Sequence, residues 1–455
     1  MCTVNQVDLC VIGAGISGLS LAAFASEQLS VCVLERESTV GGLLQSRQIG
    51  KALFDESANG WLNSEPSVDT LIQIIGAQSI VTPANTEQAT RFLVNNGLHA
   101  LSPKILMKST PLLSWWQKIR IARELIWNPN PKGEPSMADF MAKRFGRGVL
   151  DNFLAPMCAG IYADSPEHMS VRAAFPNLWK MASNGSILRQ LIQRLRDKNR
   201  TPPHLTSMQL GSHQLCQKIS DFLDDKGMSV QTNSPATHID YTAEKGWFID
   251  TPNGQVQAKA LAITCPASAA AQLLQHLHSD VSDDLDNIEY SPVAVVMQAF
   301  EQSDFTSPPI GFGALQSRSE QQSGLLGILF TSHLYPHRCP PNLVMTRSLL
   351  GGSIVPDIVF AEDSVLEAVA LEAHRTLFDS PNLHPTAVQT IRWKNAIPRY
   401  GSGHWAFQER MHQFHLSNPS LRLSGNHLFG VAVKDCIRIG QEHANHFIHT
   451  LAQKV

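Results

Sequence analysis

The sequence predicts an α/β fold with α+β parts, on three observations. The first forty residues run through strand, glycine-rich turn, helix and second strand, which is the order of a parallel βαβ unit. Residues 228–265 and 290–355 carry short β runs separated by turns. Residues 105–200, which lie between β-rich parts, carry helical patterns instead. We therefore expect domains that are interleaved along the chain rather than consecutive.

The first strand is expected at Val7–Ile12, and residues 13–18, GAGISG, follow at once. An Ala- and Leu-rich helix is expected to run to about Gln28. A second strand covers Val31–Leu34 and ends at Glu35. These elements stand in the order of a dinucleotide-binding unit.

The chemistry of the motif fits its spacing. Gly13 allows the tight turn, Gly15 lets the backbone approach a pyrophosphate, and Gly18 lets helix and strand pack closely. The helix N-terminus presents unpaired N–H groups to the phosphates. Glu35 lies 22 positions after Gly13, close to the roughly 20 expected for an acid that binds a ribose hydroxyl. The pattern predicts a Rossmann-like domain, but the spacing alone does not choose between FAD and NAD.

The next element is a hairpin. Thr90–Pro103 alternates apolar residues around Asn95-Asn96-Gly97. Arg91 precedes the apolar strand, where its guanidinium would suit a substrate carboxylate held by paired hydrogen bonds. A solvated charge at a sheet edge is the other reading of this arginine.

An amphipathic helix is expected at Leu112–Trp127, ended by Pro129 and Pro131. Tryptophans beside basic residues suit a helix in a membrane interface, whereas a helix docked on the core would show the same period. The apolar face comprises Leu112, Trp115, Trp116, Ile119, Ala122 and Ile126.

Three further helices are expected. One is at Ser136–Arg144 and is capped by Ser136, one begins after Ser170, and one is at Leu188–Arg200. The last of these is basic and faces either anionic lipid head groups or solvent. Phe153–Ala163 is uncharged, too short to cross a membrane, and too broken by a proline and a glycine for an ordinary core helix. We interpret it as the wall of a pocket for a large, flat, apolar ligand.

The C-terminal segment 423–447 predicts a strand ending at Gly425, a loop through Gly430 to Val433, and a helix from near Asp435. The N-terminus of that helix would aim a positive partial charge at the group before it. A reduced flavin ring, which gains negative charge, is a suitable target.

Composition limits the remaining classes. The chain has 455 residues, enough for two or three domains, and a net charge of -3, so we expect no nucleic-acid partner. Charged residues make up 16% of the chain, below the roughly 25% of an average soluble domain. An apolar pocket, a membrane-contacting surface or a large core would each account for this.

The eight cysteines include no C-x-x-C pair, so we expect no zinc site. Cys10 and Cys32 lie in apolar runs and are typical of buried thiols in a reducing compartment. Because a strand pattern begins by Val7, we expect no signal or transit peptide. No run approaches the roughly 18 apolar residues of a spanning helix, so a membrane contact would be peripheral.

Across its length the chain resembles the protoporphyrinogen oxidases, oxygen-dependent FAD enzymes of haem synthesis within the amine-oxidase-like flavoproteins. The similar segments, in the family's order, are VIGAGISGLSLA, the Gly41-Gly42 doublet, TRFLVNNGLHALSP, APMCAGIYADSPEHMSVRAAFPNLW, IGFGAL, LLGGS, NAIPRYGSGHW and GVAVKDC. The first is shared by many flavoproteins. The hairpin, the uncharged stretch and NAIPRYGSGHW are more particular to this family.

The resemblance implies a cofactor and a substrate site. FAD would be held by Gly13, Ala14, Gly15, Ile16, Ser17, Gly18, Glu35, Arg36, Gly42, Leu43, Ser57, Ala58, Asn59, Gly60, Ala236, Trp405, Val431, Ala432 and Val433. Arg91 would bind a substrate carboxylate, and the macrocycle would lie among Met157, Gly160, Phe312, Leu315 and Leu349. Asn59 would orient or polarise groups near the flavin, and no general base is apparent.

The resemblance also implies an organisation. The FAD-binding domain would comprise 1–85, 201–270 and 401–455, with a substrate domain at 271–400 joined by the hairpin 86–104. The block 105–200 would be a helical, membrane-associating domain.

The implied reaction converts protoporphyrinogen IX to protoporphyrin IX with molecular oxygen, by hydride transfer from a bridging carbon to flavin N5, with peroxide as by-product. Implied partners are the porphyrinogen, oxygen, a membrane surface, ferrochelatase and a second copy of the chain. The expected place is peripheral, on the cytoplasmic face of a bacterial inner membrane, with the mitochondrial inner membrane or the soluble cytoplasm as alternatives.

Three alternatives stay open: a coproporphyrinogen III oxidase, a related FAD amine or polyene oxidase, and a non-catalytic flavin-binding partner of haem enzymes. The last is kept open by Ser57-Ala58, which stands where the family has Gly-Pro. The chain also departs from the family pattern at Gln45, at QLGSHQL (209–215) and at Ala236.

Overall fold

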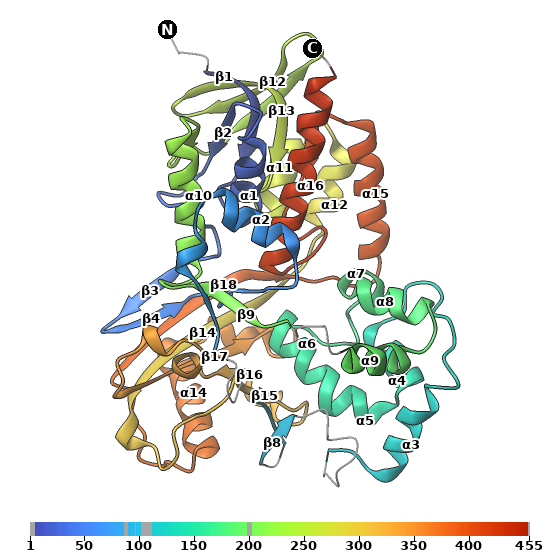
Figure 1. Cartoon of the computed structure of the whole chain (residues 1–455), viewed down its shortest axis with the longest axis vertical. Helices are drawn as coiled ribbons and strands as arrows, with labels where there is room; N and C mark the ends of the chain where they lie inside the picture. The colour runs from blue at the N-terminus through green and yellow to red at the C-terminus, as the bar shows by residue number, and fades with distance from the viewer. Residues whose placement is uncertain (1–4, 86–89, 96, 102–111, 198–202, 454–455) are drawn as a thin grey trace.

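The computed structural model describes residues 5–85, 90–95, 97–101, 112–197 and 203–453. Two seven-stranded sheets organise these residues. Figure 1 places the sheet that contains β1 and β2 in the upper part, with both chain ends. Strands β14 to β17 lie below it, and a group of helices from α3 to α9 lies beside them.

The upper sheet has the order β10-β2-β1-β13-β12-β11, and β19 also pairs with β13. β1 lies between β2 and β13 and is parallel to both. The strands of this upper sheet come from three distant parts of the chain, so the domain is interleaved, as the sequence predicts. Their bounds are β1 Asn5–Ile12, β2 Val31–Leu34, β10 Ser229–Gln231, β11 His238–Thr242, β12 Gly246–Thr251, β13 Gly254–Ile263 and β19 Leu421–Leu423.

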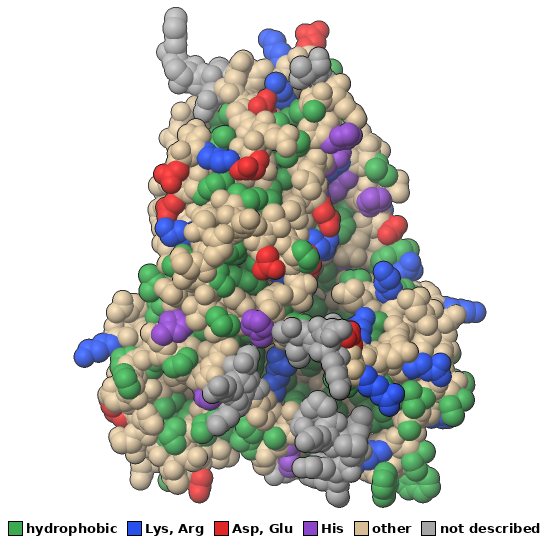
Figure 2. All heavy atoms as spheres, in the orientation of Figure 1, with side chains coloured by type: hydrophobic (Ala, Val, Ile, Leu, Met, Phe, Trp, Pro, Cys, Tyr) green, Lys and Arg blue, Asp and Glu red, His purple; other side chains and the backbone are tan. Residues whose placement is uncertain are grey.

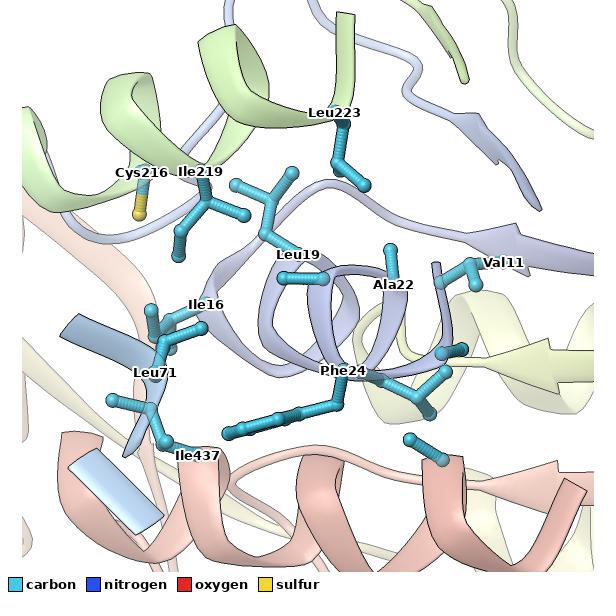
Figure 3. Packing of buried hydrophobic residues seen from close by; sticks show 14 of the residues in the cluster. Val11, Ile16, Leu19, Ala22, Phe24, Leu71, Cys216, Ile219, Leu223 and Ile437 are labelled. Carbon is cyan, nitrogen blue, oxygen red and sulfur yellow. The ribbon is translucent and has the colours of Figure 1, made fainter. Parts of the chain in front are cut away.

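Helix α1 (Ile16–Ala25) follows the glycine-rich turn and ends three residues before the predicted Gln28. It is buried on all sides, between α10 (His213–Asp225), α2 (Pro66–Ile74) and α16 (Val433–Ala452), as Figure 3 shows. The fit to α16 is close: a Cβ added at Gly440 would lie 2.5 Å from Ser20 Oγ and 3.0 Å from Leu21 N.

The opposite face of this sheet is covered by α11 (Ala267–Leu274), α12 (Ser279–Asp286) and α15 (His404–Ser417). Cys10 and Cys32 stand directly opposite one another on β1 and β2 and are fully buried, as predicted.

Buried histidines gather where α15, β19 and α16 meet. His415 Nε2 accepts a hydrogen bond from Leu423 N, and the ring of His443 meets it edge-on at 5.3 Å. Burial, with His443 and Arg422 nearby, lowers the pKa of His415 to about 2. Burial, with Arg422 and His446 nearby, lowers the pKa of His443 to about 3. Both imidazoles are therefore neutral in the folded protein.

The lower sheet has the order β18-β14-β17-β16-β15-β7-β8. The predicted hairpin is confirmed as the antiparallel pair β7–β8, although Asn96 and Pro103 lie outside the described residues. Helix α14 (Asp363–Leu377) packs on one face of the sheet. The strand bounds are β7 Arg91–Val94, β8 Leu98–Leu101, β14 Tyr290–Glu301, β15 Gly313–Gln316, β16 Leu325–Leu329, β17 Leu343–Gly351 and β18 Ala387–Pro398.

The described residues also form two small sheets. One pairs β3 (Ser46–Ile49) with β4 (Ala52–Asp55), and the other has the order β5-β9-β6. The bounds of the latter are β5 Trp61–Leu62, β6 Val81–Pro83 and β9 Leu205–Met208.

The helical block contains α3 Trp115–Arg123, α4 Met137–Arg144, α5 Arg147–Val149, a π-helical turn Leu150–Leu154, α6 Ala155–Tyr162, α7 Val171–Ala174, α8 Pro176–Ser183 and α9 Ile187–Arg196. Ser136 and Ser170 cap α4 and α7 as predicted. Lys198 and Arg200 of the predicted basic helix lie outside the described residues.

A buried ion pair ties this block together. Arg144 Nη1 lies 2.8 Å from Glu124 Oε1, with both side chains almost inaccessible. The Glu124 carboxylate also accepts hydrogen bonds from Ser186 Oγ and from the first backbone N–H groups of α9, Ile187 N and Leu188 N. A single carboxylate thus neutralises Arg144 and caps a helix.

The expectation for Phe153–Ala163 is wrong. This stretch was expected to be too broken by a proline and a glycine for an ordinary core helix, yet it continues the π-helical turn into α6, which contains both residues. Pro156 falls in the first turn of α6, where a helix needs no N–H donor, and Ala163 ends the helix in the left-handed region at φ +50°.

For Leu112–Trp127 the sequence left open a helix in a membrane interface and a helix docked on the core, and in the structure the tryptophan face is not docked on the core. Trp115 and Trp116 are 76% and 78% exposed, and α3 contacts the core through Ile121 instead. The helix is also shorter than predicted, since it ends at Arg123. Within the described ranges, no helix is long and apolar enough to span a bilayer.

Candidate active site

The glycine-rich turn has the geometry that close phosphate approach requires. Gly13 has φ +106°, in the region that favours glycine. A Cβ added at Gly18 would collide with the Gly13 carbonyl oxygen, which explains the close packing there. A Cβ added at Gly15 would meet no atom within 4 Å, so the space in front of the turn is open.

The start of α1 carries unpaired donors. Gly15 is the N-cap, and no side chain of the described residues caps the helix. The Glu35 carboxylate is buried at the end of β2 and accepts hydrogen bonds from Ala14 N (2.7 Å) and Glu37 N (2.9 Å). Each of its oxygens keeps a further lone pair, which suits a ribose hydroxyl. Arg36 is exposed and pairs with Glu37.

The glycine doublet lies beside this turn. Gly41 N donates to Ala14 O (2.7 Å), and a Cβ added at Gly42 would lie 3.3 Å from Gly15 Cα. Leu43 O accepts a hydrogen bond from Ser57 Oγ, which brings the 57–60 segment next to the doublet.

The other predicted cofactor residues fall into three groups. Ala58 packs against the cluster that contains Ile16 and Val433, while Ser17 lies in the buried first turn of α1. Trp405 and Val431 belong to the cluster of the helical block. Ala236 packs in the cluster on the far side of the upper sheet, and Ala432 is the N-cap of α16. The open turn, the uncapped start of α1 and the buried carboxylate together fit FAD.

Trp405 is held from the helical block. Glu134 accepts hydrogen bonds from Gly403 N (3.0 Å) and Trp405 N (3.1 Å) at the start of α15. The guanidinium of Arg172 lies 3.3 Å from the centroid of the Trp405 ring and 5.4 Å from that of Trp179.

Two of the predicted substrate residues, Leu315 and Leu349, lie on one face of the lower sheet. Leu315 pairs with Gly327 on β16, and Gly327 pairs with Leu349 on β17, so the two leucines flank a glycine in one row. Residues paired in this way project to the same face. The adjacent row runs from Arg91 through Gly313 and Leu329 to Arg347.

Helix α6 covers this face. A Cβ added at Gly160 would collide with Leu315 Cδ2, so helix and sheet meet there directly. All five predicted wall residues are half-buried: Met157, Gly160, Phe312, Leu315 and Leu349. Arg91 is exposed, with its guanidinium 4.6 Å from the centroid of the Phe312 ring.

Sequence reasoning missed a buried polar cluster next to Asn59. The Asp55 carboxylate accepts hydrogen bonds from Arg338 Nη1 (2.7 Å), Ser46 Oγ (2.7 Å), Ser212 N (2.7 Å) and Ser212 Oγ (3.1 Å). Arg347 Nη1 donates to Asn59 Oδ1 (2.6 Å) and to Asp55 O (3.0 Å).

Tyr335 completes the cluster by donating from its hydroxyl to Asn59 O (3.1 Å). Burial raises the pKa of Tyr335 and lowers that of Arg347 to about 10. The one sequence signal for this cluster is an arginine inside the otherwise uncharged run LVMTRSLLG at 343–351.

With this geometry in view, comparison with known proteins identifies the family. The family described as flavin-containing amine oxidoreductase matches residues 16–448. The chain belongs to this family. As a flavin-containing amine oxidoreductase it is an oxidoreductase with FAD as its cofactor.

Two similar curated relatives carry the same activity name. The chain is 28% identical to protoporphyrinogen oxidase 1 of Arabidopsis thaliana chloroplasts, over 99% of this chain and 90% of the relative. It is 28% identical to human protoporphyrinogen oxidase, over 95% and 97% respectively.

A solved structure from Exiguobacterium sp. 255-15, provisionally named as a protoporphyrinogen oxidase, supports the fold. It matches with a TM-score of 0.83 at 20% identity and covers 99% of this chain and 100% of its own.

Proposed function

We propose that this chain is an oxygen-dependent oxidase that converts protoporphyrinogen IX to protoporphyrin IX. The observation that carries the proposal is a set of five half-buried, uncharged positions: Met157 and Gly160 on α6, Leu315 and Leu349 on the facing strands, and Phe312, which contacts the exposed Arg91. The near-full-length similarity to curated protoporphyrinogen oxidases supports the same substrate class.

The wall residues hold and orient the macrocycle in this proposal. The half-buried side chains of α6 and of β15 to β17 contact its faces, and Gly160 leaves room for a flat ring once Leu315 rotates. Arg91 binds a propionate carboxylate by charge-assisted hydrogen bonds.

The reaction removes three hydrides from bridging carbons and three protons, in three two-electron rounds; of the protons, two come from pyrrole nitrogens and one from the fourth bridging carbon. Bound FAD supplies the two-electron oxidation, and molecular oxygen is the final acceptor, giving hydrogen peroxide. None of the five wall residues carries a titratable group, so the wall itself supplies no base, and in this proposal the protons pass to solvent at the exposed edge of the site. The protein contributes by holding the reacting carbon in place.

Anaerobic reduction tests the proposal. Protoporphyrinogen and, separately, coproporphyrinogen are added to the FAD-loaded protein while the visible flavin band is followed, and air is then admitted. Bleaching by protoporphyrinogen, then porphyrin fluorescence above the spontaneous rate, is expected. Bleaching by coproporphyrinogen alone would reassign the substrate. A bound flavin that neither compound reduces would leave the non-catalytic alternative.

We also propose that the helical block contacts an anionic membrane surface. The exposed Trp115, Trp116 and Ile119 on α3 stand beside Lys118, Arg120 and Arg123. Figure 2 shows green and blue side chains together over the region of α3, with few red ones. Indole rings beside basic groups suit the interface of anionic lipids.

Vesicle sedimentation tests this contact. The parent is expected to sediment with phosphatidylglycerol-containing vesicles, and the double variant Trp115→Ser, Trp116→Ser is expected to remain in solution. Leu416→Ser is the control, because Leu416 is also exposed but lies on α15. Equal sedimentation of all three proteins would contradict the proposed surface.

A further inference from the structure

Arg347 is a buried cation without a carboxylate of its own. Its side chain, on β17, is 5% exposed, and its Nε is buried without a hydrogen-bond partner. Its Nη1 donates to two neutral oxygens, Asn59 Oδ1 and Asp55 O. No carboxylate of the described residues lies within ion-pair distance of it.

The neighbouring carboxylate is already engaged. Asp55 pairs with Arg338 at 2.7 Å and takes three further hydrogen bonds from Ser46 and Ser212. The only other buried acid of this segment, Glu56, points to Arg47 at 2.6 Å. Asp55, Arg338 and Arg347 therefore carry one negative and two positive charges, a net charge of +1.

An uncompensated buried charge is costly, because no partner of opposite charge replaces its lost hydration. Two neutral acceptors return part of this cost, but not all of it. Such an arrangement is typical of a site whose counter-charge arrives with a ligand or during a reaction.

The position of Arg347 indicates which negative charge it meets. It lies two residues from Leu349 on the same face of β17, so it faces the side covered by α6 and the 55–60 segment. Asn59 is two residues beyond Ser57, which bonds to the loop of the glycine doublet beside the nucleotide motif. The cation thus stands between the predicted substrate wall and the predicted flavin-contacting segment.

Arg347 also fixes the orientation of Asn59. Because Oδ1 accepts from Arg347, the amide nitrogen Nδ2 is on the opposite side of the group. No described residue accepts a hydrogen bond from Nδ2. The amide therefore offers a free N–H pointing away from Arg347, polarised by a cation behind it.

We infer that Arg347 is a positioning residue. It orients the Asn59 amide so that its free N–H faces the flavin ring, and it supplies the positive charge that favours the reduced, negatively charged flavin. The inference rests on the flavin ring lying beside Asn59, as in the proposed function, but it does not depend on the porphyrinogen substrate.

Sulfite is a suitable probe, because it adds to N5 of oxidised flavin and leaves negative charge on the ring without any turnover. Arg347→Met is expected to weaken the sulfite affinity of the FAD-loaded protein at least tenfold. The two-electron reduction potential of the flavin is expected to fall as well, by about 30 mV for each tenfold loss in the equilibrium constant for flavin reduction. Arg410→Met is the matched control, because Arg410 is half exposed and paired with Asp284.

Two further variants separate charge from fold. Arg347→Lys keeps the cation and is expected to retain sulfite affinity within about threefold of the parent. Asn59→Ala keeps the cation but removes the oriented amide, so an intermediate loss is expected. If Arg347→Met does not fold, this pair decides the question.

Equal sulfite affinity in the parent, Arg347→Met and Arg410→Met, with FAD bound in each, would overturn the inference. So would a loss in Arg347→Lys as large as that in Arg347→Met, because the charge would then not be the cause. A protein that responds to sulfite as expected but does not oxidise porphyrinogen would refute the proposed substrate alone.

Discussion

Gly15 and Gly18 lie in one turn, but their substitution by alanine should have different consequences. A methyl group at Gly15 meets no protein atom within 4 Å, and its backbone at φ -74° suits any residue. The same methyl at Gly18 collides with the Gly13 carbonyl oxygen and lies 2.5 Å from Thr264 Oγ1. Gly15→Ala should therefore affect only the ligand, and Gly18→Ala should affect the fold itself.

The magnitudes follow from these contacts. Gly15→Ala blocks the approach of a phosphate to the first N–H groups of α1, and one charge-assisted hydrogen bond is worth about 1.5–3 kcal/mol. That loss weakens FAD binding by roughly 10- to 150-fold. Gly18→Ala forces backbone apart in a packed βα turn, which typically costs about 1–3 kcal/mol of folding free energy.

The assay uses the apoprotein of each variant. Urea unfolding of the apoprotein measures the fold, and titration with FAD, followed by flavin fluorescence, measures the site. Gly15→Ala is expected to unfold like the parent, within about 0.5 kcal/mol, while losing FAD affinity. Parent-like FAD affinity in Gly15→Ala would refute the reasoning. Equal destabilisation by the two substitutions would refute it as well.

Three further outcomes are expected. Glu124→Gln leaves Arg144 buried without a counter-charge and should lower the free energy of unfolding by about 3–5 kcal/mol in urea; a loss under 1 kcal/mol would contradict the role of the pair. The pKa values of His415 and His443 are lowered in the folded state and ordinary in the unfolded state, so below pH 6.5 the unfolded state binds more protons. The free energy of unfolding should therefore be unaffected by these two residues above pH 6.5 and should fall by roughly 1 kcal/mol per pH unit for each of them below it. A free energy of unfolding in urea that stays constant from pH 7 to 5 would contradict the burial of neutral imidazoles. Arg91→Ala should raise KM for porphyrinogen at least tenfold, with sulfite affinity unchanged; an unchanged KM would leave Arg91 as a surface charge.

Local patterns were sufficient for part of the fold. The strand, turn, helix and strand at the start of the chain are specified by glycine chemistry and by apolar runs, and the structure confirms them within a few residues. The hairpin at Arg91–Leu101 is specified in the same way, by alternation and a turn. These signals are local, so tertiary contacts do not override them.

Other features depend on contacts that no local pattern contains. The uncharged stretch around Pro156 is helical because the proline falls in a first turn, and that position depends on the preceding π-helical turn. Period alone did not show whether the Trp115 face would be covered, because coverage depends on the neighbouring elements.

The candidate site divides in the same way. The nucleotide turn was predictable because its residues are contiguous. The contact between Arg347 and Asn59 joins residues 288 positions apart and depends on the register of β17. A lone arginine in an apolar strand was the available sign of it.

The close packing of α16 against α1 also limits when the newly made chain can bind its cofactor. Helix α16 begins 408 residues after α1 ends, and it covers the face of α1 that Ser20 and Leu21 share with Gly440. At roughly 5–20 residues per second, a ribosome needs about 20–80 seconds to make that interval. During this time α1, which begins at the glycine-rich turn, lacks the helix that packs against one of its faces. We expect ribosome-bound chains that stop before residue 433 not to retain FAD, so that cofactor loading follows synthesis instead of accompanying it.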